Sequence, residues 1–342
     1  MGTVHRLIEQ QGKQGALDVL MAQGRKSGGR DPSLLSRAQI EAAAGYMCDE
    51  ETGIGYCYSG WCQAALPHRR LPDGEGWVLE SGPTTLIVQP GMRRNPGSDG
   101  RTAHYAVPYG SRARLIMIFL QSEAIRTQSR EIEMGHSLRG WMKRLGIPIG
   151  GKSIDAVREQ SELLSRCRLT FEIRRDGAVG LESQNIVDRA LFMEDPESES
   201  SGALFQQTAK LGEGFFEELL KHPVPLEEPA IRALSNNSGA LDIYAWLAYR
   251  LHSLKAPCPV NWRAIQAQFG KGFGRLDNFR HRFAENLKLA LAVYPEARVD
   301  MDERGLVLHP SRPPVSPRPY PVRRNAATDG RSYKSPRLIA GA

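Results

Sequence analysis

The sequence predicts a mainly helical α+β protein in which one order of helices and strands occurs twice. The chain has 342 residues, enough for about two domains at roughly 150 residues each. Its composition, 41% hydrophobic and 24% charged residues, is that of a globular protein and excludes a fibrous or wholly disordered one. Apolar residues recur at helical spacing in both halves, and each half ends in a pattern typical of a β-hairpin.

Composition divides the chain into five regions. An N-terminal extension, residues 1–76, is expected to be partly ordered and to precede a first domain over 77–193. The acidic segment 194–202 lacks core residues, so we interpret it as a linker. A second domain is expected over 203–310. Residues 311–342 carry prolines among arginines and are expected to form a disordered basic tail.

The order of elements in the first domain is the basis of its predicted fold. The expected elements are strands 77–79 and 84–89, helix 112–125, strand 129–134, helices 137–145 and 153–167, and hairpin strands 169–174 and 179–186. The glycines of 146–151 are expected to form the turn between the last two helices. Helix, strand, helix, turn, helix and hairpin is the order of a winged helix, a helix-turn-helix variant with a β wing.

The second half repeats this order. Its expected elements are helices 241–254, 262–269 and 277–293 and hairpin strands 297–301 and 306–308. Phe279, Phe283 and Leu287 recur on one face of the last helix, which predicts that this face is buried. The sequence therefore predicts two tandem winged-helix domains.

The excess of positive charge lies mainly in the tail. The formal net charge is +7, and residues 310–342 hold seven basic residues against one acidic residue, Asp329. The remainder of the chain is therefore nearly balanced. A surface for an acidic partner must come from local clustering of basic residues.

Hydropathy and cysteine content indicate the compartment. No aliphatic and aromatic run is longer than seven residues, whereas a membrane-spanning helix needs about 20. The first residues contain no apolar core of a secretory signal. Five scattered cysteines do not indicate a disulfide scaffold. We expect a soluble, cytoplasmic protein that makes no contact with membranes.

One segment matches the phosphate-loop pattern of nucleotide hydrolases, Gly146-Ile-Pro-Ile-Gly-Gly-Lys-Ser153. That chemistry needs a β-strand that delivers the loop, and a later strand that ends in a metal-binding Asp. Here the preceding residues, 139–145, have the pattern of a cationic amphipathic helix. We therefore interpret the match as a glycine-rich turn and expect no enzyme, no catalytic residues and no cofactor; a phosphate-loop ATPase is kept as an alternative.

Basic residues cluster around the predicted second helix of the first motif. Residues 139–175 contain nine basic and four acidic residues. Lys152, and a helix start capped by Ser153, would suit a backbone phosphate of DNA. The outward face could read base edges with Asp155, Arg158, Glu159, Glu162 and Arg166. The alternative is a solvated helix face.

The corresponding helix in the second half carries a polar face opposite its phenylalanines. The residues that we expect to contact DNA there are Arg275, Asn278, His281, Arg282 and Lys288, with Glu285 among them. Arg174 and Arg175 in the first hairpin, and Arg304 in the second, are expected at wing tips near phosphates. Solvation is again the alternative for this helix.

Four residues have a spacing compatible with a zinc site: Cys48, Cys57, Cys62 and His68. Three cysteines and one histidine can bind zinc tetrahedrally. Tyr56, Tyr58 and Trp61 lie among them, which favours a small apolar cluster with ordinary buried cysteines. We therefore predict no metal and leave a zinc site as the alternative.

Several runs of residues resemble one protein family, the plasmid-encoded RepA replication initiators. These runs are Val107-Pro-Tyr-Gly-Ser-Arg-Ala-Arg-Leu-Ile-Met-Ile-Phe-Leu-Gln-Ser-Glu-Ala124, the glycine-rich run 146–153, Leu164-Ser-Arg-Cys-Arg-Leu-Thr-Phe171, Arg232-Ala-Leu-Ser-Asn-Asn237, Tyr244-Ala-Trp-Leu-Ala-Tyr-Arg-Leu-His252 and Leu308-His-Pro-Ser-Arg-Pro-Pro314. The resemblance extends over roughly residues 77–318.

The resemblance implies a protein that binds repeated sequences at a plasmid origin, helps to open the adjacent duplex and recruits the host initiator and helicase. It also implies tandem winged helices, monomer and dimer forms, and the ability to repress its own promoter. DNA contact would fall on helices 153–167 and 277–293. We therefore expect a non-enzymatic protein that binds double-stranded origin DNA, with a transcriptional repressor of the same architecture as the alternative.

Overall fold

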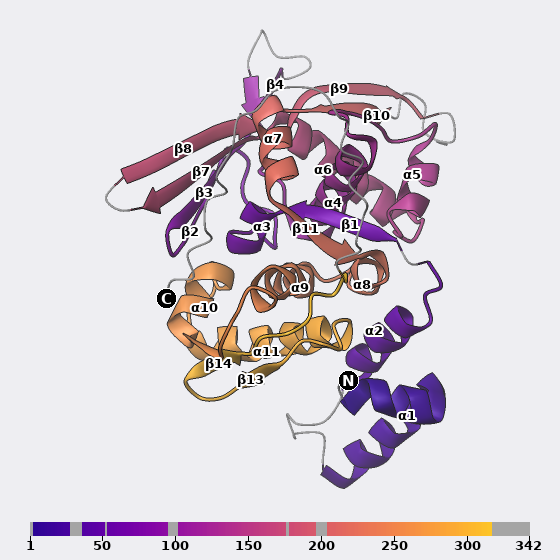
Figure 1. Ribbon diagram of the computed structural model, residues 1–342. Helices are drawn as coiled ribbons and strands as arrows, with labels where there is room; N and C mark the ends of the chain where they lie inside the picture. The colour runs from indigo at the N-terminus through magenta and orange to yellow at the C-terminus, as the bar shows by residue number, and fades with distance from the viewer. Residues whose placement is uncertain are drawn as a thin grey trace, which may run out of the picture.

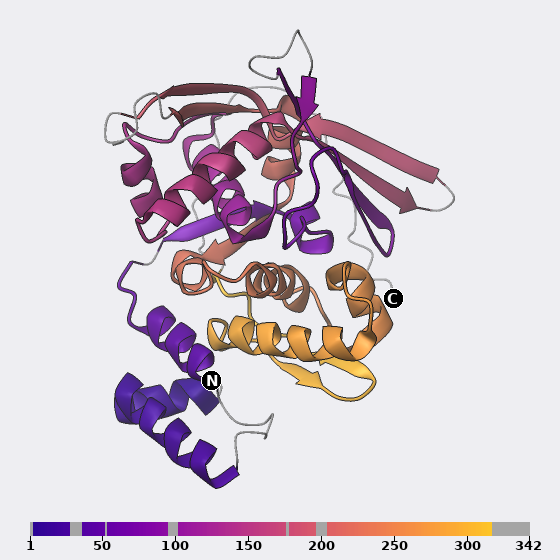
Figure 2. The same ribbon diagram turned by 180° about the vertical axis from the view of Figure 1, so that it is seen from behind.

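The fold is described from a computed structural model. The structure describes residues 3–27, 36–51, 53–94, 102–175, 178–195 and 204–316. Figure 1 shows an upper part built mainly from residues between β2 and α7, and a lower part built from the last helices and strands. The N-terminal helices α1 (Thr3–Ser27) and α2 (Arg37–Met47) lie at one lower corner (Figures 1 and 2). The mixed α and β character predicted from the sequence is confirmed.

The first half, residues 77–221, contains four helices and nine strands among its described residues. The strands are β2 (Trp77–Ser81), β3 (Thr84–Gln89), β4 (Met92–Arg94), β5 (Thr102–His104), β6 (Glu131–Glu133), β7 (Arg168–Arg175), β8 (Ala178–Asn185), β9 (Val187–Glu194) and β10 (Leu204–Leu211). The helices are α4 (Gly110–Thr127), α5 (Leu138–Arg144), α6 (Gly151–Arg166) and α7 (Glu213–Lys221). The predicted helices and the predicted hairpin of this half are present, with ends shifted by a few residues.

The pairing of these strands differs from the prediction. Hairpin β7–β8 belongs to a sheet in the order β2-β3-β7-β8 and projects from the body (Figure 1), whereas β6 pairs with β10 in the order β6-β10-β9. Strands β9 and β10 are antiparallel neighbours, with Glu194 opposite Leu204. Residues 194–202, expected to link two domains, therefore join two strands of one hairpin. An acidic composition cannot distinguish a hairpin connection from an interdomain linker.

The second half follows the predicted order. Its elements are β11 (Pro223–Glu227), α8 (Glu228–Ala233), α9 (Ser238–Leu251), β12 (Cys258–Asn261), α10 (Trp262–Phe269), α11 (Leu276–Ala292), β13 (Val299–Met301) and β14 (Gly305–Leu308). Its three-stranded sheet has the order β12-β14-β13. Trp262, Phe269, Phe279 and Phe283 pack edge to face or tilted between α10 and α11, which buries the face predicted from their spacing.

The two halves share one arrangement of helices and strands. In each, a long helix is followed by a strand, two helices and a later pair of strands, and the last strand lies in the middle of the sheet. A glycine with positive φ lies in each turn between the two helices, Gly146 at 65° and Gly272 at 97°. This backbone region strains other residues, so the glycines explain why both turns are tight.

A strand from the N-terminal region is part of the core. Strand β1 (Ile54–Tyr58) pairs antiparallel with β11, about 170 positions later, and α4 packs against it. The side chains of Gln121 and Ser122 on α4 accept hydrogen bonds from the amides of Tyr58 and Tyr56, at 2.6 and 2.8 Å. Helix α3 (Ser59–Gln63) follows directly and packs against α9. The described residues of the extension are therefore integrated into the fold.

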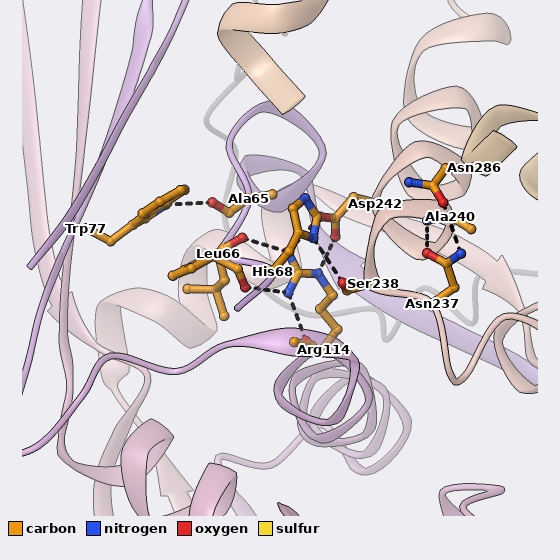
Figure 3. Close-up of polar contacts among 12 residues, drawn as sticks. Ala65, Leu66, His68, Trp77, Arg114, Asn237, Ser238, Ala240, Asp242 and Asn286 are labelled. Carbon is orange, nitrogen blue, oxygen red and sulfur yellow. Dashed lines mark hydrogen bonds and ion pairs between the residues drawn. The ribbon is translucent and has the colours of Figure 1, made fainter. Parts of the chain in front are cut away.

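One buried ion pair joins the long helices of the two halves (Figure 3). Arg114 on α4 donates from Nε and Nη2 to the two carboxylate oxygens of Asp242 on α9, at 2.6 and 2.7 Å. Its remaining N–H groups donate to the carbonyls of Leu66, Pro67 and Gly110, at 2.7, 3.2 and 2.8 Å. The Arg114 side chain is 5% exposed. Because five donors meet five acceptors, the guanidinium is fully satisfied without water.

The beginning of the predicted tail lies on the body. Ser311 donates its amide to the carbonyl of Leu251, and the hydroxyl of Tyr294 donates to the carbonyl of Arg312 at 2.6 Å. Ser311 and Arg312 are thus held against the body by hydrogen bonds. The rest of the predicted tail, 317–342, is outside the described residues.

Replacing Arg114 by Leu should lower the free energy of unfolding by about 3–5 kcal/mol, because it leaves the Asp242 carboxylate buried without its partner. The measurement is urea denaturation followed by circular dichroism. Arg37→Ala is the control, because Arg37 pairs with Glu41 on the exposed surface of α2 and should leave the urea midpoint unchanged. Equal midpoints for both variants would contradict the role assigned to Arg114.

Candidate nucleic-acid interface

The start of α6 presents free amides and a lysine to solvent. The helix begins at Gly151, and its N-cap is Gly150, without a side-chain cap. Ser153 lies in the first turn, where its amide donates to the carbonyl of Gly150, so the prediction that Ser153 caps the helix is wrong. Lys152 and Asp155 are exposed, as is Ile149 in the preceding turn. Amide dipoles and a lysine together favour an anion at this end of the helix.

The middle of α6 is bound to the protein itself. Arg158 donates to the buried carboxylate of Asp195 at 3.0 Å, which is explained by the β9–β10 hairpin that lies against this helix. Glu159 accepts from the hydroxyl of Tyr109 at 2.8 Å, and Glu162 accepts from the hydroxyl of Tyr105. The exposed face of α6 is therefore narrower than the sequence predicts, because the spacing of residues does not show which other segments cover a helix.

The other basic residues of the first half that were predicted to contact DNA lie at the ends of α6 and β7. Arg166 is exposed at the end of α6, 3.3 Å from Glu162, and its guanidinium lies 5.1 Å from the ring centre of Tyr105. Arg174 is exposed near the end of β7. Arg175 is the last residue of β7 and lies opposite Ala178 in the hairpin; its side chain is outside what the structure describes.

Helix α11 carries the polar face that the sequence predicts. Phe279, Phe283 and Leu287 are buried on one side. The predicted contact residues Arg275, Asn278, His281 and Arg282 are exposed, and Lys288 is half-buried. Arg275 is 3.9 Å from Asp277, and Arg282 is 3.0 Å from Glu285 on the exposed surface. Exposed pairs of this kind are weak, so both arginines can exchange their partner for a phosphate or a base.

A short segment of the N-terminal region lies between the two helices. Arg70 contacts Glu159 of α6 at 3.4 Å and Asp73 at 2.5 Å. Arg69 and Arg70 also line a groove together with Asn278 and Arg282 of α11. In Figure 2, α6 is the long magenta helix above this region and α11 the yellow-orange helix below it. The segment 67–71 thus connects the two predicted DNA-contacting helices.

This segment was absent from the residues predicted to bind DNA. Its sequence signal is two adjacent arginines, Arg69 and Arg70, flanked by Pro67 and Pro72. In sequence they lie outside either repeat of the helix-turn-helix order. Their position depends on the hydrogen bonds that Arg114 donates to the carbonyls of Leu66 and Pro67. The sequence alone does not show these tertiary contacts.

His68 lies beside the buried ion pair (Figure 3). Its Nδ1 is 3.0 Å from the hydroxyl of Ser238, and its Nε2 is 3.9 Å from the Asp242 carboxylate. Burial lowers the pKa of His68 to about 4, and the positive charge of Arg114 acts in the same direction, against the attraction of Asp242. The imidazole is therefore neutral at pH 7.

The cysteine and histidine series is dispersed. The Sγ atoms of Cys57 and Cys62 are 3.8 Å apart in the core, whereas Cys48 is exposed at the end of α2 and His68 is bound to Ser238. Within the described ranges, no three histidine, cysteine, aspartate or glutamate side chains gather as a metal site. The structure brings together two of the four residues. In the same ranges, none of the helices combines the length and apolar character needed to cross a lipid bilayer.

Part of the chain matches one family model. Residues 107–263 match the family model described as plasmid encoded RepA protein. The match extends from just before α4 to the start of α10, and it confirms the resemblance predicted from the sequence over this part of the chain. No curated protein matches the sequence.

Two solved structures are similar to this chain, and both are of RctB. A selenomethionine derivative of RctB domains 2 and 3 has 12% sequence identity and a TM-score of 0.43, and the alignment covers 67% of this chain and 83% of that one. A second crystal structure of RctB domains 2–3 has 10% identity and a TM-score of 0.43, with 73% and 94% covered.

The neutral state of His68 predicts a pH dependence of stability. In the unfolded chain its pKa is near 6.5, so between pH 6.5 and 4 the unfolded state binds a proton that the folded state does not. Stability contributed by this group is therefore present above pH 6.5 and is lost as the pH falls toward 4. We expect His68→Asn to reduce the drop in urea midpoint between pH 7 and pH 5. The same drop in variant and wild type would contradict this interpretation.

Proposed function

We propose that this protein initiates plasmid replication by binding repeated double-stranded DNA sites at the origin. The observation that carries the proposal is the match of residues 107–263 to the plasmid encoded RepA family, combined with a helix-turn-helix order that occurs twice in the chain. Binding is non-enzymatic. The host initiator and helicase are the proposed partners, and self-association to a dimer is proposed as a further state.

The topology supports two winged-helix units. In a winged helix, the strand between the first two helices pairs with the last strand of the following hairpin. Strands β6-β10-β9 and β12-β14-β13 both have this order. Strands β9 and β10 take the place that the sequence analysis gave to β7 and β8, which form an additional hairpin. Helices α6 and α11 are then the recognition helices.

Exposed side chains on these helices support DNA contact. Lys152 at the start of α6 suits a backbone phosphate, while Asp155 can accept from cytosine. On α11, Asn278 can pair with adenine, and Arg282 with guanine. The turn before α6 is preceded by helix α5, as predicted, and not by the strand that a phosphate loop needs. This supports DNA binding by Lys152 over nucleotide hydrolysis.

The proposal is tested by placing the gene alone beside its upstream repeats on a vector that lacks an origin. Replication of that plasmid in a permissive host supports an initiator. Repression of a reporter from the same repeats, without any replication, would instead support a transcriptional repressor.

Lys152→Ala should weaken binding about equally for all DNA sequences and reduce the slope of log affinity against log salt by about one unit, because one phosphate contact is lost. Lys13→Ala, at an exposed position on α1, is the matched control and should leave the slope unchanged. Magnesium-dependent ATP hydrolysis that disappears with Lys152→Ala would contradict the DNA-binding role.

Two recognition helices on one chain should contact neighbouring major grooves about 10 bp apart. Five base pairs inserted at the centre of the site should therefore rotate the halves out of phase and remove most of the affinity in gel-shift titrations. In footprints, Asp155→Ala should damage one half of the site and His281→Ala the other. A site that tolerates the insertion would show that the helices do not bind side by side.

A further inference from the structure

A groove lies between the segment 67–71 and the second helix-turn-helix unit. Its volume is about 660 Å³, and its walls are formed by this segment, the start of α9, the turn between α10 and α11, and the first half of α11. Four cationic residues line it: Arg69, Arg70, Lys271 and Arg282. No carboxylate is among its lining residues. A concave surface of this charge attracts an anion.

Two of the four cations of the groove, Arg69 and Lys271, form no ion pair with a described residue, whereas Arg70 and Arg282 pair with carboxylates at the exposed surface. Arg69 is exposed, and no described residue forms an ion pair with it. The ammonium of Lys271 lies 4.4 Å from the ring centre of Trp77 and donates to the carbonyl of Val78. Arg70 is placed by Asp73 and Glu159. The nearby carboxylate of Asp242 is occupied by Arg114 through both oxygens, so it does not cancel the charge of the groove.

The groove also contains hydrogen-bond donors of the backbone. Asn237 caps α9 by accepting from the amide of Ala240 at 3.0 Å, and its side-chain amide donates to Asn286 at 3.0 Å (Figure 3). The amides of Ser238 and Gly239 lie in the first turn of this 14-residue helix, where a helix offers no acceptor of its own to them. The positive end of the helix dipole thus adds to the charge of the four side chains.

We propose that this groove binds a phosphate of the DNA backbone, so that the segment 67–71 is a third DNA contact between the two recognition helices. The inference rests on the proposed function, since it assumes that α11 enters a major groove. Asn278 and Arg282 belong both to the groove and to the exposed face of α11, so a duplex held on that face passes the groove. Arg70 extends the same surface to Glu159 on α6.

The test compares Arg69→Gln with Lys13→Gln, which removes one charge from an exposed position on α1. Binding of origin repeats and of unrelated duplex DNA is titrated at 50–200 mM salt. We expect Arg69→Gln to weaken both by a similar factor, about three- to ten-fold, and to lower the salt slope by about one unit. Lys271→Gln should act in the same direction, and circular dichroism should show that both variants are folded.

The outcomes separate this inference from the proposed function. Wild-type protein that fails to bind origin repeats would overturn the proposed function. Wild-type binding with an unchanged affinity and salt slope in folded Arg69→Gln would overturn the groove contact alone. Tripolyphosphate and ADP are titrated by calorimetry as a second source of phosphate. Saturable binding that Arg69→Gln abolishes, with DNA binding unaffected, would assign the groove to a free nucleotide and contradict the DNA contact.

Discussion

The guanidinium of Arg114 is the point at which the separate parts of this chain are fixed to one another. It ties α4 to α9 through Asp242 and holds the carbonyls of Leu66 and Pro67 against the start of α4. Removing a guanidinium from water is costly, and this cost is offset only when each N–H group finds an acceptor. The ion pair therefore permits very few arrangements of the two halves of the chain.

The rigid connection between the two halves determines the distance between α6 and α11 on the surface. If the two halves were joined by a flexible linker, the spacing of α6 and α11, the proposed recognition helices, would adapt to the DNA. Here β1 pairs with β11 across about 170 positions, β9 and β10 form one hairpin, and Arg114 crosses between the units. Under the proposed function, a fixed spacing of α6 and α11 would give selectivity for the distance between half-sites, because binding a site with another spacing would require the buried pair to be broken.

Local pattern was sufficient to predict most helices of the two repeats. The spacing of Phe279, Phe283 and Leu287 predicts α11 to within one residue at each end, and the glycines of 146–151 predict the turn before α6. Pairing between distant segments could not be predicted in this way. Strands β1 and β11 are short, and their register depends on partners far away in the chain. The hairpin β9–β10 was misinterpreted because acidic residues lie between its strands.

The candidate nucleic-acid interface was predicted only in part, because local spacing does not show contacts between distant segments. A helical face shows which residues can be exposed, and Lys152, Asp155, Asn278, His281 and Arg282 are exposed as expected. It does not show which neighbours cover that face, so the ion pair of Arg158 with Asp195 was missed. Arg69 and Arg70 were missed because they belong to the groove through tertiary contacts of a segment outside both repeats.

The most direct test of a rigid arrangement is the distance in solution between α6 and α11, the proposed recognition helices. Spin labels on cysteines introduced at Asp155 and His281, with Cys48 and Cys258 replaced by serine, allow it to be measured by double electron–electron resonance. The account predicts one narrow distance distribution that stays the same when origin DNA is added and broadens in Arg114→Gln. A broad distribution in the otherwise unaltered protein that narrows only on DNA would contradict it.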